Sequence, residues 1–189
     1  MSVFPMDQFP VLTTPRLVLR RFTHGDAPEI FAMKSDLEAI KYDSDPPMPD
    51  LAAALAEIDE MNGCFNEKKG IWWGIELKES RRLIGDLVFF FHGQQFYKAD
   101  LGYGVARPYW QQGIATEAAR AAITFAFETL RVHRVNVDTR IDNPGSVGLM
   151  RTLGFTHEGT RRECIRNEDG TYQSWALYGL LEAEYRQRF

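Results

Sequence analysis

A glycine turn between a predicted strand and a predicted helix is the first candidate for a binding site. Gln112-Gly113-Ile114-Ala115-Thr116 stands directly ahead of an alanine-rich run. The first amides of a helix lack internal partners, and the helix dipole favours an anion there. Each such hydrogen bond to a charged acceptor contributes about 1.5–3 kcal/mol, against about 0.3–1 kcal/mol from the dipole. Convergent amides can therefore hold a pyrophosphate without a lysine, although an ordinary turn in which glycine only relieves strain also fits this segment.

Other common site chemistries lack their signatures. The chain contains neither GxxxxGK[ST] nor GxGxxG after a strand, which disfavours a P-loop nucleotidase and a dinucleotide fold. Cys64 and Cys164 form no CxxC pair and the four histidines are scattered, so we expect no metal and two reduced thiols. The net charge of −4 offers no general attraction to nucleic acid or to a membrane surface. With no leader or long apolar run, the chain is expected to be cytoplasmic.

Local patterns predict an α+β arrangement. A length of 189 residues indicates one domain, residues 1–189. Asp26 and Asp50 are the expected helix N-caps, Gly154 ends a helix, and the prolines of 43–49 exclude regular structure there. Strands are expected at 17–19, 71–77, 83–91, 99–106, 134–139, 155–158 and 175–180, and helices at 27–34, 51–66, 116–130 and 146–153.

Four motifs in order resemble the GNAT acyltransferases, most closely the Rim-type branch that acetylates N-terminal amines of ribosomal proteins. The resemblance covers about residues 12–182. It implies a mixed sheet of about seven strands, flanked by about four helices and splayed between two central strands, where acetyl-CoA enters. The motifs are TTPRLVLR at 13–20, ADLGY at 99–103, YWQQGIATEA at 109–118, and NPGS at 143–146 followed by LGF at 153–155.

The resemblance assigns the cofactor-binding positions. Val105 is the strand residue whose backbone pairs with the pantetheine arm, and its N–H can face the thioester oxygen and stabilise an oxyanion. Asn143 matches the residue that hydrogen-bonds the pantetheine, although an asparagine before Pro144 can also simply form a turn. The amides that hold the pyrophosphate would be those of Gln111, Gln112, Gly113, Ile114, Ala115 and Thr116.

Two positions depart from the family pattern. Trp110 stands where the family usually has Gln or Arg, so a contact from a leading cation is lost while binding through amides remains. Met150 stands where many members keep a proton-donating Tyr, and a thioether cannot donate. Ser146 matches the Ser that faces the CoA sulfur in the ribosomal branch, and is expected to stabilise the leaving group by hydrogen bonding. Helix N-capping is the alternative for Ser146.

The acceptor amine must be neutral to attack. At pH 7 an α-amine of pKa about 8 is about one-tenth neutral, but a lysine of pKa about 10.4 is only about 0.04% neutral. Asp100 occupies the strand place where several family members keep a carboxylate base, acting through water. Its alternative is a strand-edge charge paired with Lys98 or Arg107. Glu117 lies in the first helical turn, where the helix dipole favours a carboxylate, and is expected to cap the helix.

Alternation along the strand places Asp100 on one face and Tyr103 and Val105 on the other. Four aromatic residues could line an acceptor pocket, although aromatics on central strands usually belong to the core. They are Trp72, Trp73, Phe90 and Tyr103.

These residues predict an N-acetyltransferase that uses acetyl-CoA, without a metal, by direct attack of an amine in a ternary complex. No covalent enzyme intermediate is expected, because Cys64 falls in a helix and Cys164 lies outside the motifs. The acceptor is the N-terminal amine of a ribosomal or other protein, or a polyamine, aminoglycoside or metabolite. A non-catalytic acyl-CoA sensor or scaffold is the alternative from another class. Members of the family are often dimers, so by analogy a homodimer of this chain is expected.

Overall fold

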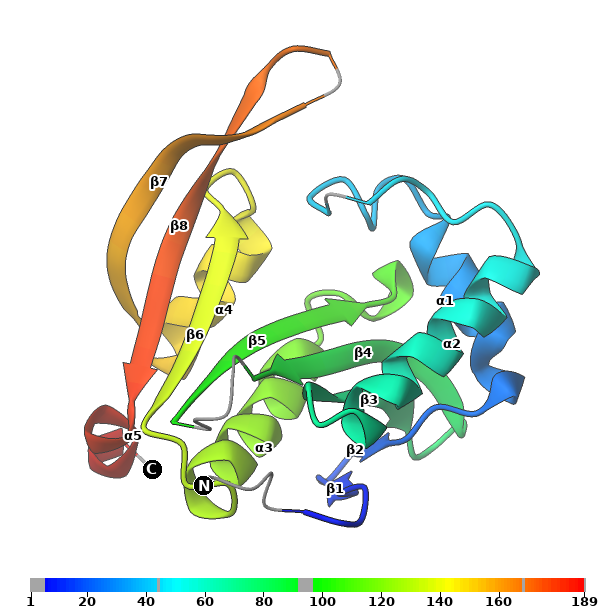
Figure 1. Ribbon diagram of the computed structural model, residues 1–189, viewed down its shortest axis with the longest axis horizontal. Coiled ribbons are helices and arrows are strands. Elements are labelled where there is room, and N and C mark those ends of the chain that lie inside the picture. The colour runs from blue at the N-terminus through cyan, green and yellow to red at the C-terminus, as the bar shows by residue number, and fades with distance from the viewer. Residues whose placement is uncertain (1–5, 44, 92–96, 168, 189) are drawn as a thin grey trace.

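An eight-stranded sheet is the frame of the protein (Figure 1). The computed structural model describes residues 6–43, 45–91, 97–167 and 169–188. The strands run in the order β1-β2-β3-β4-β5-β6-β8-β7, and every neighbouring pair is antiparallel except β5 with β6. Their bounds are β1 Leu12–Thr13, β2 Leu17–Arg20, β3 Gly70–Leu77, β4 Arg82–Phe90, β5 Lys98–Val105, β6 Arg134–Arg140, β7 Thr156–Arg166 and β8 Tyr172–Leu181.

The parallel pair in the centre of the sheet is short. β5 and β6 pair only at Lys98 with Arg134, Ala99 with Val135 and Asp100 with Asn136. Beyond these pairs β6 stays with β8 along its full length, and Figure 1 shows β5 and β6 diverging towards their carboxyl ends. The expected splay between two central strands is confirmed, and it leaves one edge of β5 without a neighbouring strand.

Helices cover both faces of the sheet. The helices are α1 Ala27–Lys34, α2 Leu51–Asn66, α3 Ile114–Glu128, α4 Pro144–Leu153 and α5 Glu182–Arg188. The small side chains of α3, such as Ala118 and Ala122, are fully buried and let this helix pack closely on the sheet within the larger core cluster, which α4 also joins. A second cluster, with Ile30 of α1 and Ile58 of α2, covers the opposite face.

The structure contains one strand that is much longer than expected and two elements that were not expected. The strand expected at 155–158 is β7, which continues to Arg166 and forms a long hairpin with β8. The two-residue strand β1 and the terminal helix α5 were not expected, which gives eight strands and five α-helices among the described residues. Asp50 caps α2 as predicted, because its Oδ1 accepts from the amide of Ala53 at 2.8 Å.

Asp26 precedes α1 as predicted, but the expectation that its side chain caps this helix is wrong. The carboxylate instead accepts two hydrogen bonds from the Arg20 guanidinium, at 2.8 and 2.9 Å, and one from the amide of Thr23 at 2.7 Å. A cation on the neighbouring strand outcompetes the helix amides, because charge-assisted bidentate bonds are stronger than neutral ones. The pair anchors the start of α1 to β2.

No described helix is long and apolar enough to cross a membrane. Within the same part of the chain, no group of three or more His, Cys, Asp or Glu side chains is arranged to hold a metal ion. Cys64, on α2, and Cys164, on β7, are both free thiols.

Candidate active site

Beyond Asp100, one edge of β5 carries backbone groups that pair with no strand among the described residues. The amide of Ala106 donates to the carbonyl of Ile84 at 2.8 Å, so Ala106 occupies a hydrogen-bonded position opposite β4. In an antiparallel pair such positions alternate along the strand, so every second residue of β5 bonds to β4. Residues at the intervening positions, Tyr103 and Val105, therefore turn their N–H and C=O groups away from β4. Since β6 accompanies β5 only as far as Asp100, these groups face the space where the two strands part.

One of these groups already has a side-chain partner. The indole Nε1 of Trp110 donates to the carbonyl oxygen of Val105 at 2.6 Å. Trp110 follows a short 3-10 turn, Arg107–Tyr109, and its side chain ties that turn to the end of β5. The residue that replaces the family's Gln or Arg thus holds the backbone of Val105 instead of supplying a cation.

The glycine turn has the geometry of an anion cradle. Gly113 is the N-cap of α3 with φ +76°, a left-handed conformation that glycine adopts without steric cost. Gln111 also has a positive φ, 58°, which is uncommon for a residue with a Cβ. The first bond of the helix is from Glu117 N to Gly113 O, so the amides of 114–116 precede it and have no partner within the helix. The helix begins at Ile114, two residues before the expected start.

A cation missing from the sequence prediction lies beside this turn. The guanidinium of Arg16 donates to the carbonyl of Gln112 at 2.9 Å and to Glu117 at 2.6 Å. Glu117 also accepts from the Thr14 hydroxyl and the Arg16 amide. Burial acts to raise the pKa of Glu117, but these bonds outweigh it and hold the pKa below its ordinary value. Glu117 therefore fastens the turn before β2 to α3, and the expectation that it caps the helix is wrong.

Asn143 and Ser146 open helix α4. The Asn143 side-chain oxygen accepts from the amide of Ser146 at 3.1 Å, and α4 begins at Pro144. Asn143 is thus the N-cap, and the alternative that Ser146 caps the helix is wrong. Capping uses the oxygen of the Asn143 amide, so its NH₂ group stays available as a donor for an incoming ligand.

The hydroxyl of Ser146 meets a tyrosine hydroxyl from the sheet. Tyr103 Oη lies 2.7 Å from Ser146 Oγ. Burial raises the pKa of Tyr103 to about 12, and the hydrogen bond to Ser146 opposes that rise. Met150, the place of the family's usual Tyr, is fully buried in the core. Alternation along β5 already placed Tyr103 on the face of Val105, which is the signal that could have led to this pair.

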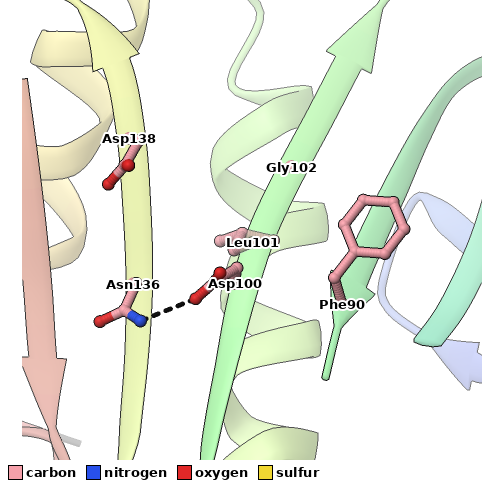
Figure 2. A pocket seen from close by; sticks show the side chains of 6 residues that line it. All are labelled: Phe90, Asp100, Leu101, Gly102, Asn136 and Asp138. Carbon is pink, nitrogen blue, oxygen red and sulfur yellow. Dashed lines mark hydrogen bonds between the residues drawn. The ribbon is translucent and has the colours of Figure 1, made fainter. Parts of the chain in front are cut away.

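Asp100 lines a cavity of about 170 Å³ at the point where the strands part (Figure 2). Figure 2 shows Asp100 and Asn136 pointing towards one another, and Asn136 Nδ2 donates to Asp100 Oδ1 at 2.7 Å. Arg107, one of the two pairing partners considered for Asp100, binds Asp36 instead, at 2.8 Å. The other lining residues are Phe90, Leu101, Gly102 and Asp138.

The four aromatic candidates occupy different places, although the rings of Trp72 and Phe90 meet edge to face with their centroids 5.5 Å apart. Phe90, 36% exposed, lines the cavity, whereas Trp73 is fully buried in the core. Trp72 donates to Asp86 at 2.9 Å on the face covered by α1 and α2. Since Tyr103 binds Ser146, only Phe90 of the four lies at the cavity of Asp100.

Comparisons with known proteins agree with this geometry. Residues 16–156 match the acetyltransferase (GNAT) domain. The chain is 32% identical to the N-acetyltransferase YoaA of Bacillus subtilis over 92% of this chain and 98% of that protein. It is 25% identical to the [ribosomal protein uS5]-alanine N-acetyltransferase of Escherichia coli over 69% of this chain and 67% of that one. A GNAT-family acetyltransferase structure from Bacillus anthracis, 22% identical, superposes with a TM-score of 0.83 over 93% of this chain and all of that chain.

The parted sheet and the domain match together define the class of this protein. The chain belongs to the GNAT acetyltransferase family. It is an N-acetyltransferase, and acetyl-CoA is its acyl donor.

Proposed function

We propose that this enzyme acetylates the N-terminal α-amine of a protein by direct attack on acetyl-CoA in a ternary complex. The observation that carries the proposal is the free edge of β5, where the backbone of Tyr103 and Val105 faces the parted strands beside the α3 turn. The similarity to an enzyme named for a ribosomal-protein alanine supports the choice of acceptor.

The residues present fit a coenzyme A thioester. Left-handed Gly113 presents the amides of 114–116 to a pyrophosphate, with those of Gln111 and Gln112 completing the turn. The Val105 backbone would pair with the pantetheine arm, and the Asn143 NH₂ group would donate to one of its amides. Bound acetyl-CoA supplies the activated acetyl group.

The protein's contribution to the reaction is proton transfer and orientation. Asp100 would take the proton of the attacking amine, directly or through a water molecule in the cavity. The N–H of Val105 would donate to the thioester oxygen, where negative charge develops. Ser146 would donate a hydrogen bond to the sulfur as the bond to carbon breaks.

A small-molecule amine is the second candidate acceptor. The cavity carries two carboxylates, Asp100 and Asp138, and a protonated polyamine would be attracted to them. Asp138 also binds Arg161 at 2.7 Å, which offsets part of that charge. The cavity therefore favours an acceptor whose amine-bearing end is positively charged, such as a polyamine.

Isotope-labelled acetyl-CoA tests the proposal directly. The enzyme is incubated with the labelled donor and a cell lysate, and proteins and metabolites are searched for the label by mass spectrometry while thiol release is followed. We expect label on protein N-terminal amines. Label on polyamines or other small amines would favour the second acceptor class. Coenzyme A binding without thiol release above the rate of enzyme-free buffer would instead identify a sensor.

A further inference from the structure

Tyr103 and Ser146 form a hydroxyl pair that the family resemblance did not predict. Tyr103 lies on β5 two residues before Val105, and Ser146 is the third residue of α4. Their oxygens are 2.7 Å apart, the usual length of an O–H···O hydrogen bond. We infer that Tyr103 is a positioning residue that directs the hydroxyl proton of Ser146 towards the sulfur of the departing coenzyme A. The inference rests on the proposed function.

The direction of this hydrogen bond is part of the inference, because either oxygen can donate at this distance. With a pKa raised to about 12 by burial, Tyr103 keeps its proton throughout the physiological range. In the proposed arrangement the Tyr103 O–H donates and the Ser146 oxygen accepts, which is one of the two directions that the geometry allows. Accepting this bond leaves the serine proton to point at a third group.

A serine or threonine hydroxyl within a helix can donate to the carbonyl four residues earlier. Thr152, on the same helix, does so to Gly148 at 3.0 Å. Among the described residues, Ser146 Oγ has Tyr103 as its side-chain partner instead. Its amide is held by Asn143 at the same time, so the backbone and the hydroxyl oxygen of Ser146 are both fixed. The proton of Ser146 is the one part of the group left to meet a ligand.

The proton balance separates orientation from acid catalysis. As the amine nitrogen bonds to the acetyl carbon and the carbon–sulfur bond breaks, the electron pair goes to sulfur and the amine proton goes to Asp100, then to solvent. An ordinary thiol has a pKa of about 8.5, so transfer of the Tyr103 proton to the thiolate would be uphill. Tyr103 therefore stays protonated, Ser146 donates a hydrogen bond, and solvent protonates the released thiolate.

The arrangement also accounts for the buried methionine on α4. Met150 is 0% exposed and serves the core, so the helix position that supplies a hydroxyl in many relatives cannot do so here. In this chain β5 supplies the phenol of Tyr103, and α4 supplies Ser146, which lies between that phenol and the proposed position of the sulfur.

The thiol pKa of bound coenzyme A tests the inference without turnover. It is followed by thiolate absorbance during pH titration of complexes with the wild type, Tyr103→Phe, Ser146→Ala and the double variant. A donor aimed at sulfur lowers that pKa, so we expect Tyr103→Phe and Ser146→Ala each to raise it by about half a unit to one unit. The double variant should match Ser146→Ala. Tyr178→Phe, at a buried tyrosine on β8, is the matched control and should leave the thiol pKa unchanged.

Turnover with an alanine-initiated peptide gives the second readout. Tyr103→Phe should lower kcat about tenfold while the KM for acetyl-CoA changes less than twofold, and it should add nothing in the Ser146→Ala background. A wild-type thiol pKa in Tyr103→Phe, or losses that multiply in the double variant, would overturn the inference and leave the proposed function intact. A wild-type enzyme that binds no coenzyme A would overturn both.

Discussion

The indole nitrogen of Trp110 lies 2.6 Å from the carbonyl oxygen of Val105 and donates a hydrogen bond to it. This bond joins the end of β5 to the segment that leads into the α3 turn. The two parts of the coenzyme A site that the proposal uses, the strand edge and the amide cradle, are therefore held together by one side chain.

Trp110→Phe removes this donor while keeping an aromatic ring. We expect the KM for acetyl-CoA to rise about three- to tenfold, because one hydrogen bond of about 1 kcal/mol no longer orients the Val105 peptide. The value of kcat should change little. Steady-state kinetics and calorimetry with coenzyme A measure the two effects. Tighter binding in this variant would mean that the indole competes with the ligand for the carbonyl.

Gly113→Val should abolish coenzyme A binding without unfolding the protein. An added Cβ would meet only Arg16 Nη2, at an ordinary 3.5 Å, so the cost to the fold is the left-handed φ, about 1–2 kcal/mol. The branched side chain would, however, occupy the approach to the amides. Gly148→Val is the control, because a Cβ at that exposed helix position meets nothing within 4 Å. Unchanged affinity in calorimetry would contradict the cradle.

Asp100→Asn should lower turnover by about 10²-fold or more if the carboxylate is the base. The loss should grow with the pKa of the acceptor, because a lysine side chain needs deprotonation more than an α-amine does. Asp138→Asn, at the other carboxylate of the cavity, is the matched control and should cost much less. The measurement is turnover as a function of pH for both variants and the wild type. A profile of Asp100→Asn that coincides with the wild type would remove Asp100 from the mechanism.

Asp26→Asn tests the anchor of α1. Burial acts to raise the pKa of Asp26, but the Arg20 hydrogen bonds outweigh it, so the folded pKa lies below the ordinary 3.8. The carboxylate's contribution to stability is therefore complete above about pH 3.8 and is lost as the pH falls through the lower folded pKa. At pH 7 the variant should be about 2 kcal/mol less stable to denaturant.

The wild type should accordingly lose more stability than Asp26→Asn as the pH falls below about 3.8. Asp59→Asn is the control, because that carboxylate pairs with His24 at the surface with 69% of its side chain exposed. Parallel pH curves for the wild type and Asp26→Asn would argue against the anchor.

Local chemistry made the start of α2 and the end of α4 predictable. The Asp50 cap and the left-handed Gly154, φ +80°, depend on a few neighbouring residues, and both were expected from the sequence. The parted sheet was also expected, but it followed from the family resemblance. Capping rules alone could not choose between Asn143 and Ser146, because either residue type suits the first turn of a helix.

Contacts between distant segments were not predictable in the same way. Arg16 reaches Glu117 across 101 positions, and Tyr103 reaches Ser146 across 43. Which cation pairs with which carboxylate depends on how β2 and α3 pack, and single-residue propensities do not contain that information. Asp26 illustrates the same limit, since Arg20 on the adjacent strand replaced the helix amides as its partner.

The short β5–β6 pairing divides the sheet into two parts, β1 to β5 and β6 to β7, which the described residues join through three residue pairs of these two strands. A pantetheine arm bound along the unpaired edge of β5 would form the hydrogen bonds that a neighbouring strand otherwise provides, and would so connect the two parts of the sheet. Binding of acetyl-CoA should then make the sheet more rigid. The melting temperature should rise as acetyl-CoA is added, and the amide hydrogens of β5 should exchange more slowly.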